Sequence, residues 1–217
     1  MKTSFLKIIA LVAIVTFSSC KDKAKEAETK EAEEAAVAEA SAITFTAVNN
    51  KSVIEWKGFK PTGSHNGTIN VSEGTVNIAN GKIESGNFTI DMASIDVLDI
   101  PKEEDGNADL RGHLTSADFF DVATYPNAKF EVTGISTVDG KTMLSGNLTM
   151  KDATNNISFP VTTSMEGDMM TLTSETFTID RSKWNIKYGS KSFFDNLGDK
   201  FINDDIELKV TLVAQKA

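Results

Sequence analysis

The chain has 217 residues, of which 40% are hydrophobic and 24% charged, and its formal net charge is −9. This composition is that of a globular domain, and its acidic balance repels phosphate, so we expect no nucleic-acid partner. The single cysteine excludes an internal disulfide framework and a cysteine-based zinc cluster.

The N-terminus has the pattern of a bacterial lipoprotein signal peptide. Lys2 and Lys7 precede an apolar run over residues 8–17, which is too short to span a bilayer and typical of a signal. The run ends in two serines and Cys20, which resembles a lipobox. We therefore expect a signal peptide over residues 1–19 and acylation of Cys20 with palmitate-like chains. The alternative is an ordinary secretory signal followed by an unmodified cysteine.

The residues around the predicted cleavage site also suggest a location. Lys21, rather than Asp, follows Cys20, and in the usual sorting of lipoproteins this favours the outer membrane. Loss of the signal takes the net charge to −11, so the acyl chains must supply the membrane affinity, at about 0.8 kcal/mol per methylene. We expect an envelope protein, lipid-anchored to the outer membrane, with its domain in the periplasm or at the cell surface.

Residues 20–42 have the composition of a disordered tether. They are almost entirely Lys, Asp, Glu and Ala, and Val37 is their one large apolar residue. Such a segment buries too little apolar surface to offset its ordering entropy. The predicted organisation is therefore a signal, a tether over 20–42 and one folded domain over 43–217.

In the folded domain, apolar and polar residues alternate over short segments, as is typical of β strands. The predicted strands cover residues 52–59, 67–78, 82–92, 128–138, 141–150, 156–165, 169–181 and 204–214. Two interruptions, 93–125 and 191–197, lack this period and predict loops with one or two short helices.

Three dipeptides predict hairpin turns between consecutive strands. Asn-Gly at 80–81 and Asp-Gly at 139–140 favour type I′ turns, because both central residues must take positive φ, and Gly-Asp at 167–168 adds a third turn. Long strands joined in this way tend to close, because closure removes exposed edges. The sequence thus predicts an all-β fold, an antiparallel up-and-down, lipocalin-like barrel.

The last predicted strand has one dry face, which is a face made of apolar side chains that avoid water. Its even-numbered positions from 206 to 212 are apolar and its odd-numbered positions are polar. An eight-stranded barrel with such a face either fills its interior with its own side chains or admits one small ligand. Periodicity leaves both alternatives open, a structural or interaction barrel and a binding barrel.

Eight segments in this order resemble the YceI-like family of lipocalin-like bacterial proteins. They are 56–58 (WKG), 63–67 (GSHNG), 86–95 (GNFTIDMASI), 110–114 (LRGHL), 116–122 (SADFFDV), 125–130 (YPNAKF), 144–150 (LSGNLTM) and 177–184 (FTIDRSKW). The resemblance implies a periplasmic setting and a barrel whose interior holds an isoprenoid, an isoprenoid quinone or another amphipathic lipid, for sequestration or transport.

A barrel that holds such a chain needs aromatic and branched aliphatic side chains on its inner face. The candidate ligand-binding residues are Trp56, Phe59, Phe88, Ile90, Phe130, Leu148, Phe177 and Trp184, with His65 near the mouth. The sequence leaves the oligomeric state open, a homodimer included.

Enzymatic and metal-binding alternatives have weaker support. His65 and His113 are the only histidines and lack a metal-ligand spacing, and residues 105–116 resemble a calcium loop but have Leu and Ser where Gly and Glu are required. Asp118 is better explained as the cap of a turn, and Arg181 as one partner of an ion pair, than as groups for acid–base chemistry. No nucleophile elbow occurs. We expect no catalytic residue, no metal site and no cofactor.

Overall fold

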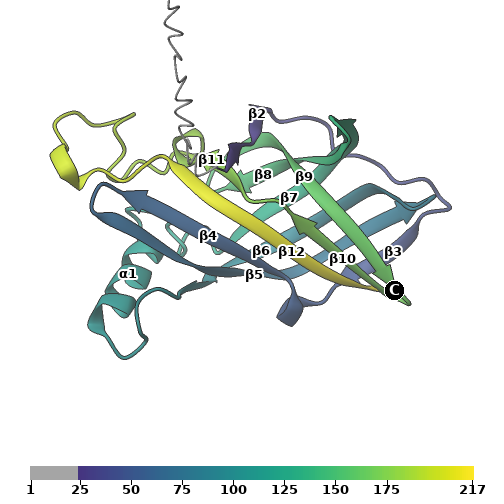
Figure 1. The fold of residues 1–217 in the computed structure, drawn as a ribbon, viewed down its shortest axis with the longest axis horizontal. Helices are drawn as coiled ribbons and strands as arrows, with labels where there is room; N and C mark the ends of the chain where they lie inside the picture. The colour runs from purple at the N-terminus through teal and green to yellow at the C-terminus, as the bar shows by residue number, and fades with distance from the viewer. Residues whose placement is uncertain (1–23) are drawn as a thin grey trace, which may run out of the picture.

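The computed structural model describes residues 24–217, so the predicted signal and Cys20 lie outside the described residues. Within this range, twelve strands form one largely antiparallel sheet that closes in a ring, with one α-helix at one end (Figure 1). The strands are β1 (Lys25–Glu26), β2 (Glu28–Glu31), β3 (Ile43–Ala47), β4 (Val53–Lys60), β5 (Gly63–Ala79), β6 (Lys82–Val97), β7 (Asn127–Val138), β8 (Lys141–Met150), β9 (Ala153–Glu166), β10 (Met169–Ser174), β11 (Phe177–Asp180) and β12 (Asp205–Lys216). The predicted barrel is confirmed.

Strand β12 closes the ring. Strands β4 to β10 pair in chain order, each antiparallel to the next. β12 then pairs with β10 and β11 on one side and with β4 on the other, and it crosses the front of the molecule in yellow in Figure 1. Closure pairs both sides of β12 and so removes most of the open strand edges that could attract another chain.

The hairpin turns have the predicted backbone. Asn80 and Gly81 have φ angles of 52° and 73°, and Asp139 and Gly140 have 50° and 76°, as a type I′ turn requires. Gly167, at φ 60°, turns the chain between β9 and β10. Turn chemistry alone was therefore sufficient to locate these three hairpins.

The predicted strand over 169–181 is instead two strands with a break between them. β10 follows β9 only as far as the pair Ser174 and Val161, and β11 then runs beside β12. The first half of β9 is left without a neighbour from β10 or β11, which creates a seam in the barrel wall.

The N-terminal segment fills this seam. β1 pairs in parallel with β11 and β2 pairs antiparallel with residues 155–158 of β9, although more than a hundred residues separate the partners in the chain (Figure 1). Between β1 and β2, Ala27 is buried and its N–H donates to the Thr178 carbonyl at 2.8 Å. We call β1 and β2 the seam strands.

The prediction of a disordered tether is therefore wrong for residues 24–42. Glu33 exchanges two hydrogen bonds with the Asn147 side chain, and the Ala36 N–H donates to Val132. Backbone hydrogen bonds to strand edges that would otherwise be unpaired order this segment, even though it has few apolar side chains to bury. The folded part begins well before the predicted boundary at residue 43.

The helix α1 (Asp105–Thr115) lies in the first of the two predicted loops and packs at one end of the barrel (Figure 1). The Asn107 side chain, which is buried, ties it to the sheet by donating to the carbonyls of Val97 and Ile100. The second predicted loop, 191–197, contains no helix, and a short 3-10 turn, η3 (Gly198–Lys200), follows it directly. Over residues 24–217, no helix is long and apolar enough to cross a membrane.

Candidate functional site

The barrel interior is hollow. An outer cavity of about 230 Å³ lies at the end that carries α1, and an inner cavity of about 70 Å³ lies deeper in the barrel. The walls of both are overwhelmingly apolar, and the two cavities share Ile54, Ile90, Leu148 and Leu208. These four side chains form a common aliphatic waist between the two spaces.

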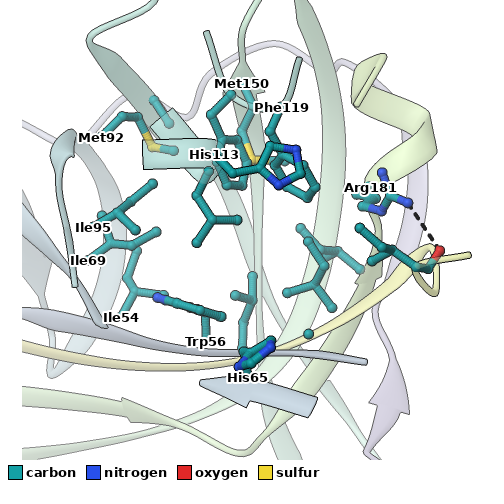
Figure 2. A pocket seen from close by; sticks show the side chains of 18 of the residues that line it. Ile54, Trp56, His65, Ile69, Met92, Ile95, His113, Phe119, Met150 and Arg181 are labelled. Atoms are coloured by element: carbon teal, nitrogen blue, oxygen red, sulfur yellow. Dashed lines mark hydrogen bonds between the residues drawn. The ribbon is translucent and has the colours of Figure 1, made fainter. Parts of the chain in front are cut away.

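The walls of the outer cavity come from several elements. Strands β4 to β6, the helix α1 and the segment after it all contribute, and β12 places Ile206 and Leu208 on the same wall. Figure 2 shows Ile54, Ile69 and Ile95 facing Phe119 and Met150 across the space. The even-numbered dry face predicted for the last strand therefore lines a cavity.

Two aromatic rings lie close to glycines of the neighbouring strand. Trp56 is paired with Gly67 on β5, where a Cβ would collide with the Asp96 carbonyl oxygen and would lie 2.8 Å from the Trp56 ring. Phe88 on β6 is opposite Gly74, where a Cβ would collide with its ring. Because each ring occupies the space above a glycine of the neighbouring strand, it contributes wall area without filling the interior.

The inner cavity is narrowed by aromatic packing. Phe159 stacks on Phe177 with a centroid distance of 4.3 Å and an interplanar angle of 7°. Phe130 packs against Phe159 at 5.8 Å and 49°. Offset or tilted ring pairs of this kind stabilise beyond their buried area, so this end of the interior is the more tightly packed.

Arg181 is a fully buried cation on the wall of the outer cavity. Its guanidinium donates to the backbone carbonyls of Ile186, Ile202 and Asn203 at 2.7 to 3.1 Å. Its Nη2 lies 3.3 Å from Asp204 Oδ1. Burial lowers the pKa of Arg181, and the nearby Asp204 and Asp180 carboxylates oppose that shift. The charge is thus committed to holding the loop before β12 against the barrel.

His65 lines the rim of the outer cavity, as predicted. Its Nδ1 lies 2.8 Å from Asp99 Oδ2, and Asp99 Oδ1 accepts the Asn66 N–H at 2.9 Å. Partial desolvation raises the pKa of Asp99, but the hydrogen bonds from Asn66 and His65 outweigh it, so the pKa lies below its ordinary value. The pair fixes the β5 strand start against the chain that follows β6.

His113 lines the outer cavity, although the sequence predicted neither a metal-binding nor a ligand-binding role for it. It projects from α1 and packs edge-on against Tyr188 at 4.4 Å and Phe119 at 5.9 Å. Its Nε2 is buried without a hydrogen-bond partner, and so is Nε1 of Trp56. Both residues line the outer cavity. His113 and Phe119 come from the aperiodic stretch 93–125, where alternation carries no information.

Eight of the nine predicted ligand-binding residues line the interior, and Trp184 does not. Trp56, Phe59 and His65 line the outer cavity, Phe88, Phe130 and Phe177 line the inner cavity, and Ile90 and Leu148 line both. Trp184 is fully buried, and its Nε1–H donates to the Leu148 carbonyl at 2.8 Å, so it is a core residue. That the other eight contact a ligand stays a prediction.

Comparison with known proteins is consistent with this architecture. Residues 31–214 match the model of the YceI-like domain family. UPF0312 proteins from Pseudomonas putida strains GB-1 and F1 are 36% and 35% identical over 89 residues, which is 38% of this chain. The match spans about half, 46%, of the length of these curated relatives.

Two solved structures share the fold. BcnA from Burkholderia cenocepacia is 25% identical with a TM-score of 0.59, and the match covers 76% of this chain and 98% of BcnA. A polyisoprenoid binding domain from Saccharophagus degradans, implicated in plant cell wall breakdown, is 13% identical with a TM-score of 0.57. That second match covers 81% of this chain and 99% of the domain.

Proposed function

Because this chain belongs to the YceI-like domain family and encloses an apolar hollow, we propose that it binds an isoprenoid or another amphipathic lipid inside the barrel. The observation that carries the proposal is the pair of apolar cavities whose walls share the aliphatic waist. Each methylene that moves from water into such a space contributes about 0.8 kcal/mol. The structural relative from S. degradans, a polyisoprenoid binding domain, supports the same ligand class.

The role we propose is sequestration or transport without catalysis. The buried charge on the cavity wall, Arg181, already donates to three carbonyls and lies beside Asp204. Asp99 at the rim is engaged by His65 and Asn66. These groups organise the walls of the cavity, and the apolar surface between them suits a ligand that is held and released unchanged.

We further propose that acylated Cys20 anchors the domain to the outer membrane. The first seam strand begins at Lys25. Five residues of fully extended chain reach at most about 18 Å, so an anchor at Cys20 would hold the barrel close to the bilayer. Short reach favours direct exchange of a lipid between the membrane and the cavity. Globomycin-sensitive processing and mass spectrometry of the mature N-terminus would test this anchor.

Ligand binding is tested on the mature chain with Cys20 replaced by Ser. We expect native mass spectrometry to show a retained lipid, which organic extraction would release, and prenols to displace a fluorescent polyene fatty acid from the emptied protein. Absence of any retained lipid after mild purification, together with no polyene binding, would contradict the proposal and favour a structural barrel.

A further inference from the structure

Two polar atoms of the outer cavity have no hydrogen-bond partner among residues 24–217. They are Nε1 of Trp56 and Nε2 of His113, and both are buried. Figure 2 shows the two side chains on opposite sides of the same space. Buried polar atoms are paired in the large majority of cases, because an unpaired one has lost its water without compensation. The two atoms therefore call for a group that the described part of the chain does not supply.

Trp184 shows that this fold can satisfy a buried indole. Its Nε1–H donates to the Leu148 carbonyl at 2.8 Å, and the ring is fully buried away from the cavities. Trp56 has the same donor, but that donor is on a cavity-lining side chain and is left free. Trp56 lines a cavity and Trp184 does not. The acceptor that Trp56 lacks therefore belongs to the molecule that enters the cavity.

The remaining unpartnered atom among the described residues has another explanation. Oδ1 of Asp204 makes no hydrogen bond but lies 3.3 Å from Nη2 of Arg181, so it has a charge partner. His113 lacks such a partner, and Tyr188 and Phe119 hold its ring edge-on from two sides. The imidazole is thus positioned by aromatic packing alone, with Nε2 free for a ligand.

The chemistry of the two atoms specifies the ligand group. An indole N–H is a donor only, so the group facing Trp56 must be an acceptor, whereas imidazole Nε2 donates or accepts according to its tautomer. The buried cation nearby, Arg181, is already engaged, and a charged group would lose its hydration in this apolar space. An uncharged oxygen, a carbonyl or a hydroxyl, fits both atoms.

We propose that Trp56 and His113 form a polar subsite for the uncharged, oxygen-bearing end of the bound lipid, with the Trp56 indole donating to that oxygen. This inference rests on the proposed function and adds an orientation to it. The oxygen-bearing end lies in the outer cavity, and the hydrocarbon chain passes the aliphatic waist toward the inner cavity.

The test compares three ligands with one hydrocarbon chain: a methyl ketone, the corresponding alcohol and the alkane. Their affinities are measured by displacement of a fluorescent polyene from the wild type and from Trp56→Phe and His113→Phe. The ketone-to-alkane affinity ratio is compared between proteins, so that differences in aqueous solubility cancel. We expect this ratio to fall about tenfold in Trp56→Phe, the value of one good hydrogen bond. In His113→Phe we expect the ketone-to-alkane ratio to fall less than it does in Trp56→Phe. We expect the alcohol-to-alkane ratio in His113→Phe to fall by about as much as the ketone-to-alkane ratio falls in Trp56→Phe.

Trp184→Phe is the matched control. It makes the same chemical change, but it removes an N–H that is bonded to the protein. We expect it to lower the midpoint of urea unfolding and to leave the ketone-to-alkane ratio unchanged. Trp56→Phe should leave the midpoint of urea unfolding nearly unchanged, because no protein hydrogen bond is lost, and should lower the ketone-to-alkane ratio. If Trp184→Phe does not fold, the ratios of the wild type, Trp56→Phe and His113→Phe still decide the question.

The outcomes separate this inference from the proposed function. If ketone and alkane bind and Trp56→Phe leaves their ratio unchanged, the subsite is wrong and lipid binding stands. Lys60 is an exposed residue at the end of β4 that also lines the outer cavity. If a fatty carboxylate binds far more tightly than the ketone and loses that advantage in Lys60→Met, the ligand end is charged and lies beside Lys60, which also overturns the subsite. If no probe binds the wild type, both proposals fail.

Discussion

The two ends of the barrel interior differ in how much space and polarity they contain. At the inner end Phe130, Phe159 and Phe177 pack against one another and leave about 70 Å³. At the outer end the Trp56 ring lies over Gly67, and about 230 Å³ remains. Both ends are built from alternating strands with inward apolar residues. The difference shows that the side chains facing one another across the ring decide whether a dry face becomes a packed core or a cavity.

The polarity of the cavity walls also differs between the two ends of the barrel interior. The inner cavity is lined by aliphatic residues and phenylalanines, whereas the outer cavity also contains Trp56, His113 and Arg181. An amphipathic ligand has the same asymmetry, with a hydrocarbon tail and a polar end. We therefore expect the inner end to contribute mainly to stability and the outer end mainly to ligand recognition.

Phe159→Ala should have the largest effect. It removes the central ring of the inner aromatic cluster, and we expect the free energy of unfolding to fall by about 3–5 kcal/mol, measured by urea denaturation. Leu114→Ala, on the wall of the outer cavity, is the comparison, because this half-buried side chain already borders empty space. Equal losses in the two variants would contradict the division between the ends.

Ala27→Asp should open the seam beside the inner end. A carboxylate at this buried position has no partner, so we expect the seam strands to detach, with a loss of about 2 kcal/mol in unfolding free energy. Hydrogen exchange should then accelerate at the backbone amide of residue 27 and at the amides of β2, which pairs with β9. Ala35→Asp, at an exposed position of the same segment, is the control and should leave exchange unchanged.

Leu208→Trp should separate the two cavities. Leu208 belongs to the aliphatic waist, and a larger side chain there would block the passage to the inner cavity. We expect a long prenol to lose about tenfold in affinity while a short prenol that fits the outer cavity loses little. Lys209→Trp places the same side chain on the other face of β12 and should change neither affinity. Equal loss for both prenols would mean that the chain does not pass the waist.

Acidification should have the smallest effect, confined to the rim of the outer cavity. The folded-state pKa of Asp99 lies below its unfolded value, so its contribution to stability is present above the unfolded pKa and is lost as the pH falls through the folded pKa. We expect Asp99→Asn to cost under about 1 kcal/mol at neutral pH and to flatten the stability profile below about pH 4. Urea midpoints across this range, with Glu103→Gln at an exposed site as control, would measure it. A profile as steep in Asp99→Asn as in the wild type would remove Asp99 as the cause.

Much of the fold was predictable because its signals are local. Asn80 and Gly81 identify a hairpin from their tolerance of positive φ, and the alternation in β12 identifies the cavity face from two-residue periodicity. The aromatic and aliphatic character of the predicted site residues, together with the family resemblance, selected eight residues that line the cavities, and their contact with a ligand stays a prediction. It also selected Trp184, because an aromatic side chain in a strand-rich segment looks the same in the sequence whether it faces a core or a cavity.

The class of fold, the hairpins and the apolar character of the interior follow from the amino-acid sequence, because turn geometry and alternation act over a few neighbouring residues. Three features became visible only in the folded chain: β1 and β2 complete the wall, glycines lie opposite Trp56 and Phe88, and His113 lines the outer cavity. Each of these depends on which strand edges and side chains meet across the ring. Those contacts join residues that are distant in the chain, and local periodicity does not predict them.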